Sequence, residues 1–434
     1  MKNGTPTESA LLRFFMALLQ IARPARIMPR YFIFILLLFS LAIFGQRVPV
    51  KAASPDDGLK QYVRNGGYMV LNHNNEAILA CNQDRPFLPA SIVKIVTSLA
   101  GIKILGKDYR FATGFYLSEA NDLYITGYGD PYLVSEEITA VAGRLTALGL
   151  REIRNIYLDD QAFRLENYTA EGTSRTLNPY DVTNGALIVN FNTVNLEVSI
   201  EGVIRSAEPQ TPTLPLMKRL GRDLPPGIHR INITTDENNS LQYAGELFRE
   251  LFKAGSIKVL GTSGRARVPD NLQPLYVHRS SKDLSKIIEG LMLYSNNFIA
   301  NQLFLTCGAM VHGYPATWEK ARQAMQAFLG KELGLDEKSI SLAEGSGISR
   351  KNRVTPRAMT GILKEFAPYA SLLALEDGIR LKSGTLSDVF SYAGYFQGRE
   401  GPAPFVLILN QRKNSRDAAL RLLRRGFAEL DARP

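Results

Sequence analysis

The spacing of apolar and polar positions divides the chain into three stretches. Two short apolar runs at 68–71 and 77–80 flank residues 72–75, whose asparagine-rich composition is typical of a turn, so we expect a β-hairpin. Residues 90–105 follow with apolar side chains at helical spacing, and Pro89 stands just before them, where a helix tolerates a proline. The first stretch therefore predicts a hairpin followed by a long helix.

The second stretch, residues 108–268, has a different pattern. It contains short segments of alternating polarity, separated by turn residues, and a proline-rich run. This pattern predicts a β-rich region with few long helices. We expect strands at 123–126, 155–158 and 186–189, and one amphipathic helix at 241–254.

The third stretch returns to longer elements. It predicts helices at 281–305, 318–329 and 416–430, and three strands at 381–386, 390–396 and 404–410. The early hairpin and these strands can form one five-stranded antiparallel sheet covered by helices. We therefore predict an α+β fold in which 53–107 and 269–434 form one domain and 108–268 is a β-rich insertion.

Residues 1–52 have the pattern of an export signal. An apolar run at 31–45 follows three arginines and is shorter than the ~20 residues that span a bilayer. Ala52 and Ala53 offer a signal-peptidase site. We expect a cleaved signal peptide and a periplasmic or otherwise extracytoplasmic protein. An uncleaved anchor with loose membrane association is the alternative, and a start at Met28 would give the signal a more usual shape.

Charge and cysteine usage narrow the possible chemistry. The formal net charge is +10, but residues 1–52 hold seven basic residues and one acidic residue, so most of the excess lies in the leader and indicates no nucleic-acid partner. Cys81 and Cys307 can pair in an exported protein, although two buried thiols are the favoured interpretation. The four histidines are scattered and no Cys/His group has zinc spacing, so we expect no metal, no other cofactor and no Ser-His-Asp triad.

Ser91-Ile92-Val93-Lys94 is the only Ser-x-x-Lys sequence in the chain. On a helix, residues three positions apart share a face, so the Ser91 hydroxyl and the Lys94 amine can meet. A serine becomes a strong nucleophile when a base takes its proton. Lysine serves as that base when burial or a nearby cation lowers its pKa. Taken alone the motif has a high chance of being accidental.

Two later motifs supply complementary groups. Ser295 offers a second hydroxyl for proton transfer, and Asn297 offers an amide for Lys94 and the substrate. On a late strand, Lys382 offers a cation for a substrate carboxylate, and Gly384 removes a Cβ where an extended substrate can lie. Taken singly, each motif has an ordinary structural explanation. The first is a polar helix end, and the second is an exposed lysine on a strand.

In this order and context, the three motifs resemble those of the active-site serine penicillin-binding proteins and serine β-lactamases. Within that group the chain is most similar to the class C low-molecular-mass penicillin-binding proteins, which are D-alanyl-D-alanine carboxypeptidase/endopeptidases with a large insertion. The long gap between Ser91 and Ser295 leaves room for such an insertion. Residues 344–350 resemble the family segment Asp-Gly-Ser-Gly-Leu-Ser-Arg, and residues 295–300 resemble Ser-Asp-Asn-Leu-Ile-Ala.

The departures from the family pattern are small. Ser383 stands in place of the commoner threonine, and Asn296 and Glu344 stand in place of aspartates. Tyr294-Ser295-Asn296 also fits the Tyr-x-Asn of class C β-lactamases one residue earlier. We prefer Ser295 and Asn297, because the residues after Asn297 follow the penicillin-binding pattern.

The resemblance implies a fold, a substrate and a set of roles. The fold is the serine β-lactamase/penicillin-binding transpeptidase-like domain, and the partners are peptidoglycan peptides ending in D-Ala-D-Ala and, as covalent inhibitors, β-lactam antibiotics. Ser91 is the expected nucleophile and Lys94 its base, and Ser295, held by Lys94 and Asn297, is the expected proton relay. The expected substrate-binding residues include two for the charged end of a diaminopimelate side chain, Arg350 and Asp159; the others are Lys382, Ser383, Gly384, Thr385, Leu386 and Ser387.

Three rival functions follow from the same residues. A β-lactamase or esterase of this fold is disfavoured by the large insertion and the lack of an obvious deacylating acid. An inactive wall-binding relic is disfavoured because Ser91, Lys94 and Lys382 are all present. An unrelated binding module would require all three motifs to be accidental.

Overall fold

The computed structural model describes residues 58–166, 170–174 and 176–432. The expected signal peptide at 1–52 lies outside them. Within the described residues, no helix is long and apolar enough to cross a membrane.

A six-stranded antiparallel sheet forms the centre of the domain outside the insertion, in the order β15-β16-β17-β18-β1-β2. Five of these strands were predicted, and the sixth is the short edge strand β15. Met69 pairs with Val406 and Ser383 with Tyr392, which joins the two ends of the chain in one sheet. The bounds are β1 (Gly66–Leu71), β2 (Ala77–Cys81), β15 (Ala374–Glu376), β16 (Ile379–Leu386), β17 (Val389–Gly398) and β18 (Gly401–Leu409).

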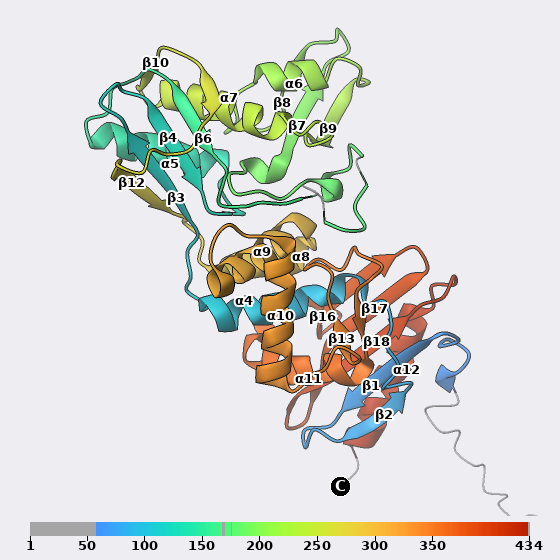
Figure 1. Ribbon diagram of the computed structural model, residues 1–434. Coiled ribbons are helices and arrows are strands. Elements are labelled where there is room, and N and C mark those ends of the chain that lie inside the picture. The colour runs from blue at the N-terminus through green and yellow to red at the C-terminus, as the bar shows by residue number, and fades with distance from the viewer. Residues whose placement is uncertain (1–57, 167–169, 175, 433–434) are drawn as a thin grey trace, which may run out of the picture. The chain divides into compact units, whose positions relative to one another are not determined.

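The sheet is buried on both faces, because successive strand residues point to opposite sides. On β18, Val406 and Ile408 enter the core that includes α4, while Phe405 and Leu407 enter the core beneath α12. Figure 1 shows α11 and α12 on opposite faces. The helices of this domain are α4 (Val93–Leu105), α8 (Leu284–Tyr294), α9 (Asn297–His312), α10 (Trp318–Leu333), α11 (Pro356–Phe366) and α12 (Arg416–Asp431).

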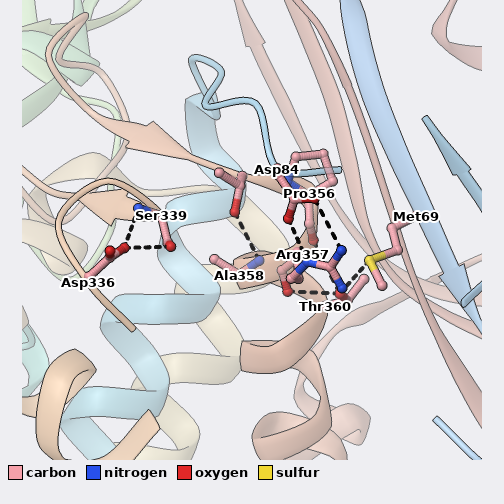
Figure 2. A network of polar contacts seen from close by, with 9 residues as sticks. Met69, Asp84, Asp336, Ser339, Pro356, Arg357, Ala358 and Thr360 are labelled. Carbon is pink, nitrogen blue, oxygen red and sulfur yellow. Dashed lines mark hydrogen bonds and ion pairs between the residues drawn. The ribbon is translucent and has the colours of Figure 1, made fainter. Parts of the chain in front are cut away.

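Polar contacts fasten α11 to the first hairpin (Figure 2). Arg357 Nε donates to Asp84 Oδ1 at 2.5 Å, just beyond the end of β2, and Thr360 Oγ1 lies 3.3 Å from Met69 Sδ of β1. Thr355 caps the helix by accepting a hydrogen bond from the Ala358 N–H at 3.1 Å. These bonds link parts of the chain that are far apart in sequence. The short strands β13 (Ile340–Ser341) and β14 (Arg353–Val354) pair nearby.

The inserted region is built on a mixed sheet in the order β11-β6-β4-β3-β12. Its last strand, β12, pairs with β3, so we place the end of the insertion at Arg279 rather than at residue 268. A three-stranded sheet, β8-β7-β9, and a parallel pair, β5-β10, complete it. The bounds are β3 (Ala112–Leu117), β4 (Leu123–Gly127), β5 (Glu152–Ile153), β6 (Ile156–Asp159), β7 (Thr193–Val198), β8 (Ile204–Ser206), β9 (Gly227–Asn232), β10 (Lys258–Val259), β11 (Ser263–Arg265) and β12 (Pro274–Arg279).

Two expectations for the insertion are corrected. Besides the predicted helix, now α7 (Asn239–Ala254), it contains the 13-residue α5 (Ser135–Ala147) and the short α6 (Pro215–Leu220). The expected strand at 186–189 is absent from the described structure. Its alternation is real, because Ile188 packs in the core of the domain outside the insertion and Leu187 in the core of the insertion, but among the described residues the segment pairs with no strand.

The two cysteines carry thiols rather than a disulfide bond. Cys81 is half-buried at the end of β2, and Cys307 is buried within α9. Burial raises the pKa of the Cys307 thiol to about 12, so it is protonated and unreactive at neutral pH.

Candidate active site

Ser91 lies immediately before the buried helix α4. It belongs to the 3-10 turn η1 (Ala90–Ile92), and Ala90 has a φ of 51°, a left-handed conformation that is rare for a non-glycine residue. On the following turn, Lys94 Nζ donates a hydrogen bond to Ser91 Oγ at 3.0 Å. The structure therefore brings together the hydroxyl and the amine of the Ser-x-x-Lys sequence.

Lys94 is fully buried and has an acceptor for each of its ammonium hydrogens. Besides Ser91, it donates to Asn297 Oδ1 at 2.8 Å and to the carbonyl oxygen of Ser346 at 2.7 Å. Burial, and then the positive charge of Lys382, lower the pKa of Lys94 to about 7, and the negative charge of Glu344 opposes them. A lysine with this pKa is partly neutral near pH 7, the form that accepts a proton.

The helix predicted at 281–305 is interrupted at Ser295, so that expectation is wrong. Helix α8 ends there because Ser295 is left-handed, with a φ of 52° and a ψ of 38°. A new helix begins at Asn297, after Asn296 caps it by accepting a hydrogen bond from the Ile299 N–H at 3.1 Å. Apolar side chains continue on both sides of the break, so their spacing does not reveal it.

The break determines which asparagine meets Lys94. Asn297 contacts the lysine, whereas Asn296 is occupied as a helix cap and Tyr294 is 78% exposed. This geometry fits the Ser295 and Asn297 register rather than the alternative one residue earlier. Within the described residues, Ser295 makes no hydrogen bond to Lys94 or Asn297, so the expected bonds that hold Ser295 are not present.

A buried carboxylate supports the loop behind Lys94. Glu344 is fully buried, and its oxygens accept hydrogen bonds from the Gly347 N–H at 2.8 Å and from the Asn352 amide at 2.7 Å. The remaining donors to Glu344 are the Ser349 N–H and the N–H and hydroxyl of Ser346. These bonds hold the Ser346 carbonyl against Lys94. We identified the segment 344–350 by resemblance, but its contact with the lysine was not expected.

Strand β16 places Lys382, Ser383 and Gly384 beside Ser91. A Cβ on Gly384 would lie 2.8 Å from the Ser91 nitrogen, so this position requires glycine because of the protein's own backbone as well as any substrate. Strand β15 pairs with β16 only as far as Leu381. Among the described strands, residues 382–386 therefore have a strand partner on one side only, which leaves an edge for an extended peptide.

Lys382 is 4% exposed, and its Nζ donates to the carbonyl oxygen of Ser383 at 2.9 Å. Burial lowers the pKa of Lys382 to about 8, the charge of Glu376 opposes this, and the charge of Arg416 adds to it. Lys382 thus keeps a positive charge in the pH range where Lys94 begins to lose its own. The two lysines are suited to opposite roles, one as a base and the other as a cation.

Arg416 is a site residue that the sequence analysis missed. It begins α12, and its Nη1 donates to the carbonyl oxygen of Gly384 at 2.9 Å and to Thr385 Oγ1 at 3.1 Å. Its guanidinium stacks on Tyr392, 4.2 Å from the ring centroid, and its Nε is buried without a hydrogen-bond partner among the described residues. A cation at a helix N-terminus interacts unfavourably with the helix dipole. This unusual position of Arg416 is the sequence signal that could have identified it as a site residue.

The outer substrate residues are placed differently. Arg350 Nη2 donates to the carbonyl oxygen of Ser387 at 2.6 Å, beside Leu386, so the structure brings these residues together. Asp159 does not join them in the described contacts. Its oxygens accept hydrogen bonds from the Gln161 N–H at 3.1 Å and the Val268 N–H at 3.0 Å, within the insertion. The Asp159 carboxylate thus holds two turns of its own region, and its expected role toward a diaminopimelate side chain stays a prediction.

Comparison with known proteins identifies the family to which a chain with this arrangement belongs. Residues 53–218 and 220–377 match the D-Ala-D-Ala carboxypeptidase 3 (S13) family. The chain belongs to this family. A D-alanyl-D-alanine carboxypeptidase of Actinomadura sp. (strain R39) is 26% identical over 84% of this chain and 80% of its own length. The family assignment makes this chain a penicillin-binding, serine-type D-Ala-D-Ala carboxypeptidase, as the motifs predicted.

Solved structures of other proteins show the same fold. Penicillin binding protein 4 (DacB) of Haemophilus influenzae aligns with a TM-score of 0.71 at 21% identity, over 87% of this chain and 99% of that one. A predatory peptidoglycan endopeptidase of Bdellovibrio bacteriovorus aligns with a TM-score of 0.52 at 16% identity, over 85% of this chain and 92% of that one. The predicted transpeptidase-like fold with an added β-rich region is thus confirmed.

The family match ends at residue 377, before Lys382 and the strand that carries it. The place of that strand in the site therefore rests on geometry, namely the fit of Gly384 against Ser91 and the pairing of β16 with β17.

Proposed function

We propose that Ser91 is the nucleophile of an exported D-Ala-D-Ala carboxypeptidase/endopeptidase that acts on peptidoglycan stem peptides and cross-bridges. The observation that carries this proposal is the 3.0 Å contact between Ser91 Oγ and a fully buried Lys94 whose pKa is about 7. The apolar run at 31–45 supports export.

In the proposed acylation step, neutral Lys94 takes the proton of Ser91 Oγ as the oxygen attacks the carbonyl carbon between the two D-alanines. The backbone N–H groups of Ser91 and Thr385 stabilise the oxyanion, and loss of one such donor typically costs ~100- to 1000-fold in rate. The C–N bond then breaks, and the leaving nitrogen receives, through Ser295, the proton that Lys94 took from Ser91, which leaves Lys94 neutral again. Water attacks the resulting ester as Lys94 takes one of its protons, and when the bond between the acyl carbon and Ser91 Oγ breaks, Lys94 returns that proton to Ser91 Oγ.

We assign the substrate carboxylate to the cationic end of β16. Lys382 lies on this strand, and Arg416 of α12 donates to the carbonyl oxygen of Gly384 on the same strand. The Arg416 Nε lies 3.7 Å from Asp417 Oδ1 and makes no hydrogen bond among the described residues, so the guanidinium has a donor left for a substrate carboxylate. Ser383 and Thr385 supply hydroxyls beside them. β-Lactams carry a carboxylate in a comparable place, and structures of the similar proteins include a β-lactam complex and a penicillin G acyl-enzyme.

The role of Arg416 has a direct test. Arg416→Gln should lower kcat/KM for a D-Ala-D-Ala peptide by about 10-fold, the value of one charge-assisted hydrogen bond, and Arg416→Lys should recover part of it. Arg424→Gln, which removes the same charge from the same helix, is the control. Equal losses in Arg416→Gln and Arg424→Gln would contradict a specific role.

Intact-mass spectrometry after incubation with benzylpenicillin tests the proposed function. We expect one stable adduct on the peptide that contains Ser91, and no adduct in Ser91→Ala. Labelling of Ser91→Ala at another residue would overturn the assignment of the nucleophile. Rapid consumption of penicillin without an adduct would indicate a β-lactamase, and intact penicillin without an adduct would indicate an inactive relic.

A further inference from the structure

A cavity opens beside Ser295, away from the contacts of Lys94. Its volume is about 440 Å³, and Tyr294 and Asn296, the chain neighbours of Ser295, form part of its wall. The opposite wall comes from the insertion and includes Tyr132, Phe191 and Arg230. Neither the family motifs nor the proposed mechanism uses Tyr132, Phe191 or Arg230.

The lining of this cavity is positively charged. Arg230, Lys282 and Lys286 contribute to it, and none of its lining residues is acidic. Lys286 pairs with Glu289 at 2.8 Å, whereas in the described part of the chain Arg230 and Lys282 pair with no carboxylate. Lys282 Nζ instead lies 5.9 Å from the centroid of the Tyr132 ring. Two such cations in a cavity that is also lined by aromatic rings favour an anion attached to an apolar group.

The backbone behind the cavity is strained in a way that positions Phe191. Asn190, Phe191 and Asn192 are consecutive and all left-handed, with φ values of 46°, 59° and 55°. Asparagine tolerates this conformation, but it is unfavourable for phenylalanine, and strain of this kind persists only where the surroundings enforce it. The strain marks Phe191 as a residue held in place rather than one that merely fills space.

Buried asparagine side chains supply that enforcement. Asn190 accepts a hydrogen bond from the Ser135 N–H at 2.9 Å and donates to Tyr243 Oη at 2.9 Å. Asn192 donates to the carbonyl oxygen of Thr183 at 3.0 Å.

The held phenylalanine links the cavity to the catalytic helix. Phe191 makes edge-to-face contacts with Tyr132 and Phe298, each with a centroid distance of 6.2 Å. Phe298 directly follows Asn297, which accepts a hydrogen bond from Lys94. The aromatic wall and the catalytic asparagine are therefore parts of one packed unit.

We propose that this cavity binds a carboxylate carried by the stem peptide upstream of the scissile D-Ala-D-Ala bond. The inference rests on the proposed function, because it assumes a peptide acylating Ser91. Three extended residues span roughly 10 Å, so a substrate in the active site can extend into a cavity whose wall flanks Ser295. Arg230 and Lys282 would bind the carboxylate, and Phe191 and Tyr132 would contact the adjoining alkyl groups.

Two synthetic pentapeptides ending in D-Ala-D-Ala test the proposal. They differ only at one acidic residue on the N-terminal side of D-Ala-D-Ala. Its carboxylate is free in one peptide and converted to an amide in the other. For the wild type we expect kcat/KM to be about fivefold higher for the free carboxylate, the size typical of a partly exposed charge pair. Arg230→Gln and Lys282→Gln should each reduce this ratio toward one. Arg322→Gln, an exposed arginine of α10 paired with Glu319, should leave it unchanged.

The rate of acylation by benzylpenicillin, which lacks the upstream peptide, separates the possible failures. It should be the same in the wild type and all three variants, which also shows that they fold. If the wild type cleaves both peptides equally, or if Arg230→Gln and Lys282→Gln keep the full ratio, the cavity does not bind the carboxylate. If the wild type is not acylated at all, the proposed function fails instead.

Discussion

Lys94 in the catalytic domain and Asp130 in the insertion are both buried, and burial moves the pKa of each to about 7. The two groups differ in their partners. Each N–H of Lys94 has an acceptor, and one of these is the hydroxyl of Ser91. Asp130 Oδ1 accepts a hydrogen bond from the Tyr132 N–H at 2.8 Å, but its Oδ2 has no partner among the described residues.

A neighbouring buried pair, Glu137 and His278, shows how hydrogen-bond donors can offset the effect of burial on the pKa of a carboxyl group. Glu137 accepts a hydrogen bond at 2.8 Å from His278, and both are buried. Burial tends to raise the pKa of Glu137, but hydrogen bonds from His278 and Ser281 outweigh it and lower that pKa. The comparison teaches that a shifted pKa alone does not identify a catalytic group. The deciding feature is a reactive atom within reach, which Lys94 has in Ser91 Oγ.

The strongest test of this difference is Lys94→Met, which keeps the side-chain length and removes the amine. Loss of the general base should slow acylation by benzylpenicillin about 1000-fold or more, since such bases typically contribute ~100- to 10,000-fold. The measurement is the acylation rate by mass spectrometry at pH 7.5. Lys320→Met, which removes a lysine that donates to Gly313 and Pro315 carbonyls, is the control. A Lys94→Met rate within tenfold of the wild type would rule out Lys94 as the base.

The pH dependence of kcat/KM provides the next test. Lys94 acts as a base only when neutral, so activity should rise with pH through about 7 and fall about tenfold for each pH unit below that value. Lys382 binds a carboxylate only when charged, so activity should fall as pH rises above about 8. We expect a bell-shaped profile, and Lys382→Gln should lack its alkaline limb. An unchanged alkaline limb in Lys382→Gln would assign that limb to another group.

Glu344→Gln should have a smaller, directional effect. The negative charge of Glu344 raises the pKa of Lys94, so its removal should move the acid limb of the acylation profile toward lower pH. The glutamine NH2 group also replaces an acceptor facing backbone N–H groups, which should destabilise the fold by about 1–3 kcal/mol. The measurements are the pH profile and the Tm. Glu365→Gln, on the exposed surface of α11, is the control, and a shift of the limb to higher pH would refute the argument.

The sequence allowed the catalytic sheet to be predicted because its strands have regular spacing and clear turns. It also identified Ser91, Lys94 and Asn297, which the structure brings together, because they lie in short local motifs. Helix α5 was missed although Ile138, Val141, Ala142 and Leu145 have helical spacing and are buried. The helical spacing is visible in the sequence, although turn residues on both sides of it favour a β-rich interpretation.

Other features depend on contacts that no local pattern encodes. The third acceptor of Lys94 is a backbone carbonyl, that of Ser346, and any residue type supplies one. Arg416 reaches Thr385 only because α12 packs on β17 and β16. Asp159 looks like a free acid in the sequence, yet its oxygens are occupied by backbone N–H groups of its own region. Such roles follow from tertiary packing, so they required the structure.

The last prediction concerns Asp130, where we expect a change in stability and not in catalysis. Its pKa in the folded chain is about 7, raised from 3.8, so its stabilising contribution is full below pH 3.8 and is lost as pH rises through about 7. Asp130→Asn keeps the Oδ1 acceptor and carries no charge. It should therefore match the wild-type Tm near pH 4 and exceed it at pH 8, with roughly 2–4 °C for each kcal/mol gained.

Asp270→Asn, an exposed acid paired with Arg267, is the control and should show no gain that grows with pH. Acylation by benzylpenicillin should be unchanged in Asp130→Asn. If Asp130→Asn instead slows acylation as strongly as Lys94→Met, Asp130 is coupled to the chemistry, and the contrast between the two buried groups disappears. If its Tm gain is the same at pH 4 and pH 8, the carboxyl is already ionised in the fold, because only a group that titrates between those values can make the difference depend on pH.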